Sequence, residues 1–296
     1  MVQVCGSGAC QPVAVPMRPP TDFLWQRDPF QLSGGGSGLV ESPGIDYILP
    51  YWMGRAYGLG SAVVQSAAGA SAAVAPDSIA SMYGSNLVAG PAQASSQPLP
   101  LTLGGISLNV TDSAGQTRAA PLIYVSPSQV NFVMPAGTQP GPSLLTIGSR
   151  LGSGQTATAT VRNVGPTLFS ADGSGNGVAA ATAIQVQVAN PRVRGSVPVY
   201  QCSGSICTSI PIQLGIDTPI YLSLCGTGIR HYSSLSNVQV TIGGITVPLQ
   251  YAGPQPDFAG LDQINALLLQ LHGAGDVNVI VTVDGQASNT VTVNIR

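Results

Sequence analysis

The chain has 296 residues, of which only 7% are charged, against about a quarter in an average soluble protein. Its formal net charge is −2, every basic residue other than histidine is an arginine, and no basic stripe could neutralise phosphates, so nucleic-acid binding is excluded. A membrane span is not expected either, because the longest weakly polar run, residues 61–76, consists mainly of Ala, Gly and Ser.

The rest of the composition is typical of a β protein. Glycine and proline contribute 37 and 24 residues, and Ser, Thr, Val and Ile fill the stretches between them. Such a mixture disfavours long helices and favours short strands joined by tight turns. The length suits two domains better than one core. A polar surface with so few charges also favours a protein that lies outside the cell or packs against copies of itself.

Residues 1–60 differ in character from the rest and are predicted to form an irregular, aromatic-rich N-terminal arm. The first residues show no signal peptide, so an upstream start or an unconventional export route is expected, with the first preferred. Pro and Gly interrupt this segment, which leaves its large side chains to dock elsewhere, on their own domain or on a neighbouring subunit. The predicted subunit-contact residues are Phe23, Trp25, Phe30, Tyr47, Tyr51, Trp52 and Tyr57.

The five cysteines fall into two close pairs and a single residue. Cys5 with Cys10 and Cys202 with Cys207 share the spacing C-x4-C, with Gly and Ser between them, which lets a short loop close. Local disulfides are the prediction, and a zinc site shared by the two pairs is the alternative. Cys225 stands alone in an apolar run and is predicted to be a buried structural thiol.

From about residue 61 onward, five sequence blocks occur twice in the same order. PDSIASMYGSNL and LTLGGISLNV in the first copy match TPIYLSLCGTGI and VTIGGITVPL in the second, and three further blocks follow in each copy. We predict two tandem domains, residues 61–166 and 167–296. Short strands with turn signals every 8 to 12 residues indicate that each is an immunoglobulin-like β-sandwich.

Two features of these blocks give local predictions. The glycine pairs 104–105 and 243–244 interrupt apolar strands at equivalent places, and they predict a bulge or sharp bend that carries a strand from one sheet toward the other. Near the C-terminus, Val277 to Val283 and Val291 to Ile295 alternate apolar and polar residues on either side of Asp284-Gly285. This pattern predicts a terminal hairpin.

The motifs of residues 61–296 also resemble a known family. APDSIASMYGSNL, LPLTLGGISLNV, APLIYVSPSQVNFVMP, GPTLFSADGSGNGVAAA and FAGLDQINALLL, with VDGQASNTVTVNI, resemble the Solibacter uncharacterised C-terminal domain family of secreted acidobacterial proteins. The resemblance implies an exported protein with β-rich domains, and it brings no activity, cofactor or catalytic residue. Residues 1–60 lie outside it.

Candidate chemistry is sparse. His231 and His272 are the only histidines, no G-x-S-x-G motif occurs, and both are expected at turns or strand ends rather than in a catalytic triad. The stretch from Asp172 to Gly177 begins like a calcium loop, but Ala183 stands where the bidentate glutamate is required, so a turn is expected. Asn109 lies in a glycosylation sequon on the polar face of its strand. We predict no enzyme activity, cofactor or metal.

The leading hypothesis from the sequence is a non-enzymatic structural protein, extracellular or on the cell surface, that self-assembles into a filament or surface layer. The aromatic arm or an exchanged strand would join one copy to the next, and a head-to-tail contact of this kind gives fibres. The alternative is a carbohydrate-binding or cell-surface attachment module of an exported protein, with cell-surface glycans as partners. That alternative predicts exposed aromatic side chains on one sandwich face.

Overall fold

The computed structural model describes residues 2–6, 9–13, 62–149, 152–187, 194–215, 218–268, 271 and 273–296, the first two segments by their backbone alone. Nearly all regular structure in these ranges is β-strand, and helix is confined to one 3-10 turn, η1 (Leu235–Asn237). The all-β prediction is confirmed. None of the described helical structure is long and apolar enough to cross a membrane.

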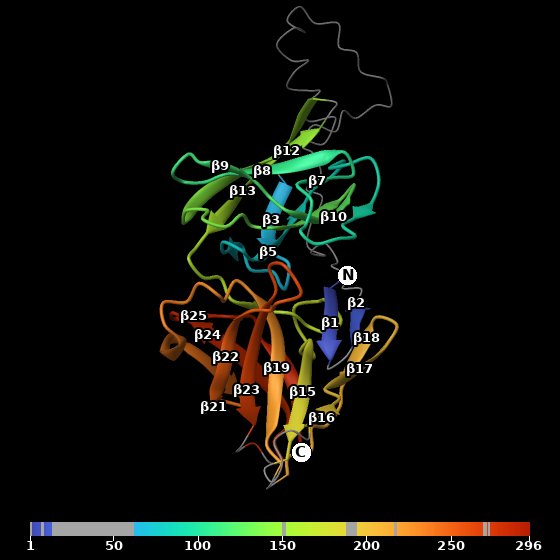
Figure 1. Cartoon of the computed structure of the whole chain (residues 1–296), viewed down its shortest axis with the longest axis vertical. Coiled ribbons are helices and arrows are strands. Elements are labelled where there is room, and N and C mark those ends of the chain that lie inside the picture. The colour runs from blue at the N-terminus through green and yellow to red at the C-terminus, as the bar shows by residue number, and fades with distance from the viewer. Residues whose placement is uncertain are drawn as a thin grey trace, which may run out of the picture.

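The N-terminal unit, residues 62–161, is one curved, nearly closed barrel-like sheet (Figure 1). Its strands are β3 (Ala62–Ser66), β4 (Ala73–Val74), β5 (Ile79–Tyr83), β6 (Ala92–Gln93), β7 (Thr102–Leu103), β8 (Ile106–Thr111), β9 (Thr117–Ala119), β10 (Leu122–Ser126), β11 (Gln129–Val133), β12 (Gly141–Ser149) and β13 (Gly152–Val161). They follow the order β6-β10-β11-β5-β3-β13-β12-β8-β7. The sheet nearly closes because β7 lies beside β10.

The C-terminal unit, residues 164–296, places two sheets face to face. One has the order β16-β15-β19-β23-β22, with β14 also on β19, and the other has the order β21-β20-β24-β25, with β26 also on β24. The strands are β14 (Thr167–Leu168), β15 (Ala181–Val186), β16 (Arg194–Val197), β19 (Ile220–Thr227), β20 (Val238–Ile242), β21 (Ile245–Val247), β22 (Leu249–Pro254), β23 (Asp262–Leu268), β24 (Gly275–Val283), β25 (Gln286–Ala287) and β26 (Val291–Ile295).

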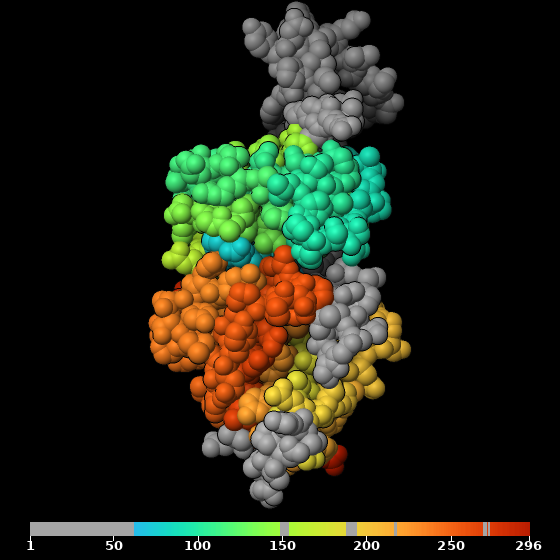
Figure 2. Space-filling view, in the orientation of Figure 1, coloured from blue at the N-terminus to red at the C-terminus, as the bar shows by residue number. Residues whose placement is uncertain are grey.

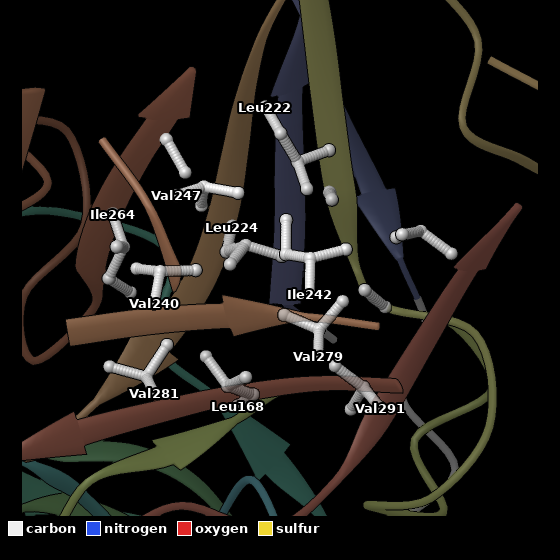
Figure 3. Close-up of a cluster of buried hydrophobic side chains, with 14 of the residues drawn as sticks. Leu168, Leu222, Leu224, Val240, Ile242, Val247, Ile264, Val279, Val281 and Val291 are labelled. Atoms are coloured by element: carbon white, nitrogen blue, oxygen red, sulfur yellow. The ribbon is translucent and has the colours of Figure 1, made fainter. Parts of the chain in front are cut away.

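Strict alternation of apolar residues builds the core between these two sheets. Leu222 and Leu224 point inward from β19, and Val279 and Val281 point inward from β24, all with 1% exposure or less (Figure 3). Because successive strand residues face opposite sides, the residues between them face away from this core. The same alternation therefore determines which residues lie on the outer face of the β19-β23-β22 sheet.

Two hairpins lie outside the main sheets. β17 (Tyr200–Ser203) pairs with β18 (Ile206–Ser209), and β1 (Val2–Gly6) pairs with β2 (Ala9–Val13), both antiparallel. β1 lies next to β15 of the C-terminal unit, as Figure 1 shows. The N-terminal hairpin therefore flanks the sheet formed by β15, β19, β23 and β22.

The two units share most of their strand order, which is the structural counterpart of the repeated blocks. The path β10-β11-β5-β3 corresponds to β22-β23-β19-β15, and the pair β13-β12 corresponds to β26-β24. The glycine hairpin beside that pair differs between the units: β12 pairs with β8, which follows Gly104-Gly105, whereas β24 pairs with β20, which precedes Gly243-Gly244. In the N-terminal unit the two halves join through the parallel pair β3 and β13, and in the C-terminal unit through parallel bridges such as Val178 with Thr292. The immunoglobulin-like assignment and the domain limits stay predictions.

The paired glycines form hairpin turns, so the prediction of a bulge or bend at these positions is wrong. Leu103 pairs with Ile106 across Gly104-Gly105, and Ile242 pairs with Ile245 across Gly243-Gly244. All four glycines have positive φ, between +58° and +82°. A two-residue turn that matches strand twist needs positive φ at both positions, which is why glycine recurs there. The terminal hairpin of β24 and β26 is confirmed.

The units meet in a small apolar cluster that belongs to neither core. It is built around Phe169, Ile79 and Leu261, with alanines from both units. A Cβ placed on Gly260 would lie 2.6 Å from Ile79 Cγ1, so the loop before β23 approaches the N-terminal unit as closely as glycine allows. Packing of this kind holds the two units end to end, as Figure 1 shows.

A buried threonine hydroxyl completes this junction. The Thr227 hydroxyl accepts a hydrogen bond from the Ile79 N–H at 2.8 Å and donates one to the Gly260 carbonyl at 2.7 Å. Thr227 has no exposed surface. One hydroxyl therefore satisfies a backbone group from each unit where water has no access.

The turn glycines give a stability prediction. Replacement of Gly244 by alanine should cost about 1 kcal/mol of unfolding free energy, because the new Cβ has open space and only the left-handed backbone is penalised. Gly104→Ala should cost more, since its Cβ would lie 2.8 Å from Val125 Cγ2 in the core. Guanidinium chloride unfolding measures both, and equal losses would contradict the role given to Val125.

The junction gives a second prediction. Thr227→Val keeps the side-chain shape but leaves the Ile79 N–H and the Gly260 carbonyl unpaired, so it should destabilise the protein by about 1–3 kcal/mol. Thr227→Ser keeps the hydroxyl and is the matched control, with a smaller expected loss. Thermal unfolding in parallel scans measures the difference, and a serine variant as unstable as the valine variant would refute the hydrogen-bond argument.

Candidate binding face

The titratable side chains do not gather into a catalytic group in the described residues. His231 Nε2 lies 2.9 Å from Asp77 Oδ2, an exposed pair that links the two units. His272 lies outside the described residues. Burial raises the pKa of the Cys225 thiol to about 12 and leaves it a poor nucleophile at neutral pH. Within the described ranges no three His, Cys, Asp or Glu side chains are placed to hold a metal ion.

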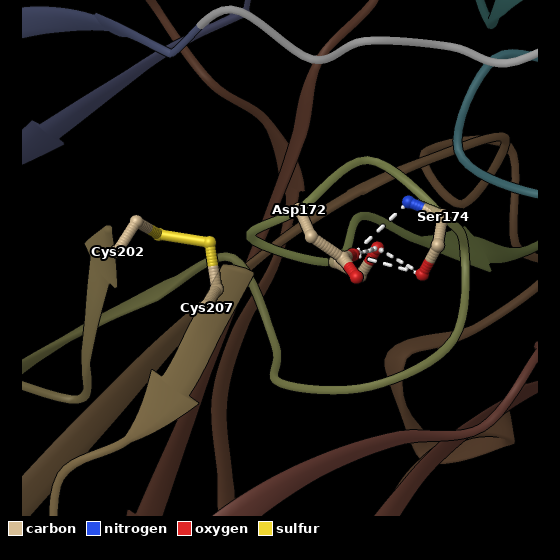
Figure 4. Close-up of a disulfide and its surroundings, with 5 residues drawn as sticks. Asp172, Ser174, Cys202 and Cys207 are labelled. Atoms are coloured by element: carbon tan, nitrogen blue, oxygen red, sulfur yellow. Dashed lines mark hydrogen bonds between the residues drawn. A yellow bond between two sulfur atoms is a disulfide. The ribbon is translucent and has the colours of Figure 1, made fainter. Parts of the chain in front are cut away.

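The calcium-like stretch after Phe169 is a self-contained turn (Figure 4). Asp172 Oδ1 accepts hydrogen bonds from Ser170 Oγ at 2.7 Å and from the Ser174 N–H and Oγ at 3.0 and 2.8 Å. Burial acts to raise the pKa of Asp172, but these donors outweigh it and the pKa is lowered. The oxygen that would bind a cation in a calcium loop is thus used within the loop, as in an Asx turn.

One disulfide is defined in the described side chains. Cys202 and Cys207 are cross-strand partners in the β17–β18 hairpin and are bonded, with a Cα–Cα distance of 4.1 Å (Figure 4). Cys5 and Cys10 occupy the same kind of paired position in β1 and β2, but their side chains lie outside the described part. Asn109 is half-buried on β8, on the face opposite the buried Leu108.

The predicted subunit contacts also lie outside the described residues, so the structure does not place them. They are Phe23, Trp25, Phe30, Tyr47, Tyr51, Trp52 and Tyr57.

Among the described residues, the candidate binding surface is the outer face of β19, β23 and β22, where an exposed tyrosine lies beside polar side chains. A β-bulge in β22 creates this arrangement: Leu249 pairs with Ala266 and packs on the core, whereas Tyr251 pairs with Asn265, which faces outward. In a regular strand, residues two apart would face the same side. The extra residue, Gln250, turns the tyrosine onto the outer face.

A row of uncharged polar side chains crosses the sheet beside Tyr251. Cross-strand pairing aligns Tyr251 with Asn265, Asn265 with Ser223, and Ser223 with Thr182. Gln263 Nε2 donates to Asn265 Oδ1 at 2.9 Å along the same strand. The tyrosine is 39% exposed and the other four side chains are half-buried. The orange surface of β22 and β23 turns toward the viewer in Figure 2.

The Tyr251 ring lies along the strand surface in a fixed position. Its hydroxyl donates to the Pro254 carbonyl at 2.7 Å. A Cβ on Gly253 would lie 2.9 Å from the Tyr251 Oη and 3.2 Å from Cζ, so the ring occupies the space that a side chain would fill. The absence of a Cβ at Gly253 lets the ring lie close to the sheet.

The N-terminal unit carries the same arrangement with different surroundings. Tyr124 pairs with Asn131 after an equivalent bulge, and Asn131 pairs with Ser81. Gln129 Nε2 donates to Asn131 Oδ1 at 2.7 Å. Ser81 and Asn131 are buried, with 0% and 6% exposure, and Ser126 stands where the C-terminal unit has Gly253. The open version of the row therefore belongs to the C-terminal unit.

Sequence reasoning did not find this face, although a signal was present. P-L-x-Y occurs at residues 121–124 and 248–251, and Q-x-N occurs at residues 129–131 and 263–265. These motifs belong to the repeated blocks, but simple alternation places the leucine and the tyrosine of P-L-x-Y on one face. Only the bulge in the observed pairing separates them.

No family model matches the chain, and no curated protein matches it in sequence, so the Solibacter resemblance stays a prediction. Among solved structures, the chain is similar to SGBP-B of the Bacteroides ovatus mixed-linkage glucan utilization locus, solved with a mixed-linkage heptasaccharide, at 16% identity and a TM-score of 0.29 over 76% of this chain and 44% of that chain. It is also similar to the Escherichia coli adhesin FdeC, at 13% identity and a TM-score of 0.23 over 79% of this chain and 64% of that chain.

The chain spans less than two thirds of the length of each of these structures. Similarities at this level assign neither a fold family nor a function to it.

Proposed function

We propose that the chain is a non-enzymatic carbohydrate-binding and attachment module of an exported protein, and that the outer face of β19, β23 and β22 is its binding surface. The observation that carries the proposal is the partly exposed row in which Tyr251 lies beside Asn265, and Asn265 lies beside Ser223. Tyr251 supplies the exposed aromatic side chain that carbohydrate binding by a sheet face requires.

The chemistry of the row suits a sugar. A sugar ring presents C–H groups on its faces and hydroxyl groups around its rim, so it fits beside an aromatic ring and polar groups that both donate and accept hydrogen bonds. Tyrosine combines an apolar ring with a polar tip. Asparagine, glutamine and serine side chains each donate and accept. Sites of this kind use apolar contact for affinity and a few placed polar groups for orientation.

A location outside the cytoplasm is part of the same proposal. The Cys202–Cys207 disulfide supports it, because disulfides persist in oxidising compartments and are rare in the cytosol. The low charge content and the resemblance to a family of secreted proteins agree with it.

Self-assembly into a filament or layer stays a prediction, and it is the second candidate. The observation that favours it is the edge position of β22, which pairs only with β23 among the described strands and could accept a strand from another copy. The aromatic arm that would also join copies lies outside the described residues.

Carbohydrate binding predicts a measurable result for the full chain. Its migration in native gels should slow when a neutral polysaccharide is cast into the gel, across a panel of neutral glucans, mannans, xylans and galactans. Unchanged migration across the panel, supported by an empty glycan array, would refute the function.

Deletion of residues 1–60 tests the second candidate. If the aromatic arm joins subunits, the full chain should form fibres or layers in negative-stain electron microscopy, and the shortened chain should give dispersed particles. Dispersed particles from the full chain, or unchanged assemblies after the deletion, would exclude the arm as the connecting element.

A further inference from the structure

We propose that Tyr251 forms a preorganised stacking platform for an uncharged sugar ring, with Asn265, Gln263 and Ser223 as its hydrogen-bonding partners. This inference rests on the proposed carbohydrate-binding function and names its subsite and its ligand class. The ligand class is a neutral polysaccharide built of pyranose rings.

The platform is held in position before any ligand binds. The Tyr251 hydroxyl donates to the Pro254 carbonyl at 2.7 Å, and the ring lies over Gly253, where a Cβ would lie 2.9 Å from the Tyr251 Oη. Two side-chain torsions are thereby restricted while the side chain remains 39% exposed. An aromatic ring that is already fixed loses little conformational entropy when a ligand stacks on it.

The polar partners have spare hydrogen-bonding capacity. Asn265 Oδ1 accepts from Gln263 Nε2, which leaves Asn265 Nδ2 as a donor and Gln263 Oε1 as an acceptor. Neither atom, nor Ser223 Oγ, bonds to another group in the described part of the chain. A mutual hydrogen bond orients the two amides, so a donor and an acceptor are presented side by side next to the ring. Adjacent sugar hydroxyls need this pair of groups.

The absence of charge on the three strands selects a neutral ligand. β19, β23 and β22 contain one charged residue, Asp262, whose side chain is fully buried. Its carboxylate accepts from Arg230 Nε at 2.7 Å and from the Ile229 N–H at 2.8 Å, and it lies on the buried face of β23, not on the outer face. An anionic ligand would find no cation on these strands to replace its hydration.

The uncharged, polar character of the face favours a sugar over a strand from a second copy. A docked strand bonds to the backbone of an edge strand, whereas β19 and β23 are already paired on both sides and offer only side chains. The free groups of the row are side-chain amides and hydroxyls, which match sugar hydroxyls rather than a peptide ladder.

The first experiment compares matched tyrosine variants of the full chain. The dissociation constant for the neutral polysaccharide that binds best in the gel panel is measured by isothermal titration. Tyr251→Ala should weaken binding about tenfold, the upper range for one aromatic contact. Tyr124→Ala, at the equivalent position of the N-terminal unit, is the control and should leave the affinity within about twofold of the parent.

The second experiment moves the platform without removing it. Gly253→Ser introduces the residue that stands at the same place in the N-terminal copy, and its Cβ would displace the Tyr251 ring. We expect a loss of affinity close to that of Tyr251→Ala, whereas Asn265→Ala should weaken binding less. Thermal unfolding of each variant, within a few degrees of the parent, shows that the fold persists.

The outcomes separate the two proposals. If the parent binds neutral polysaccharide but Tyr251→Ala and Gly253→Ser bind equally well, the platform is wrong and the carbohydrate function stands. If the parent binds acidic polysaccharides in preference, the neutral ligand class is wrong. If no polysaccharide binds and Tyr251→Ala instead converts an oligomer to a monomer in sedimentation experiments, the face is a contact between copies and both proposals fall.

Discussion

The proposed binding face depends on one irregularity, the β-bulge in β22. Leu249 and Tyr251 would face the same side of a regular strand, yet the leucine packs on the core and the tyrosine lies outside. The extra residue between them changes the register by one, and this change allows an apolar anchor and an exposed ring to stand two positions apart. The same bulge follows Leu122 in β10, so the device belongs to the repeated unit and not to a local accident of the C-terminal copy.

The two units use the device differently. Each aligns a tyrosine, an asparagine and a serine across three strands, and each has a glutamine that donates to the asparagine. In the N-terminal unit the serine and asparagine are buried, and Ser126 stands at the position equivalent to Gly253. In the C-terminal unit the row is partly open, and Gly253 leaves room for the ring. The two units thus share the bulge and the row of side chains. They differ in the residue at position 253 or 126 and in how far the row is buried.

The junction explains how the two units form one elongated particle. Apolar side chains around Phe169, Ile79 and Leu261 join the two units, and the Thr227 hydroxyl satisfies backbone groups from both sides where water has no access. Close backbone approach requires small residues, which Ala67, Ala68, Ala180 and Gly260 provide around the larger side chains of the cluster. The open face of β22 and β23 lies on the side of this particle and is not covered by the neighbouring unit, as Figure 2 shows.

The sequence by itself determined the all-β class, the order of the repeated blocks and the terminal hairpin, because residue periodicity and turn chemistry are local properties of the chain. The glycine pairs predict a bulge or bend, whereas the structure has a two-residue turn at each pair. Both features favour glycine, and they differ only in which residues pair across them. The tertiary structure alone decided the face on which Tyr251 lies, the burial of one row and the exposure of the other. Those depend on register and on contacts between residues far apart in the chain, such as Ile79 with Thr227, which no local pattern encodes.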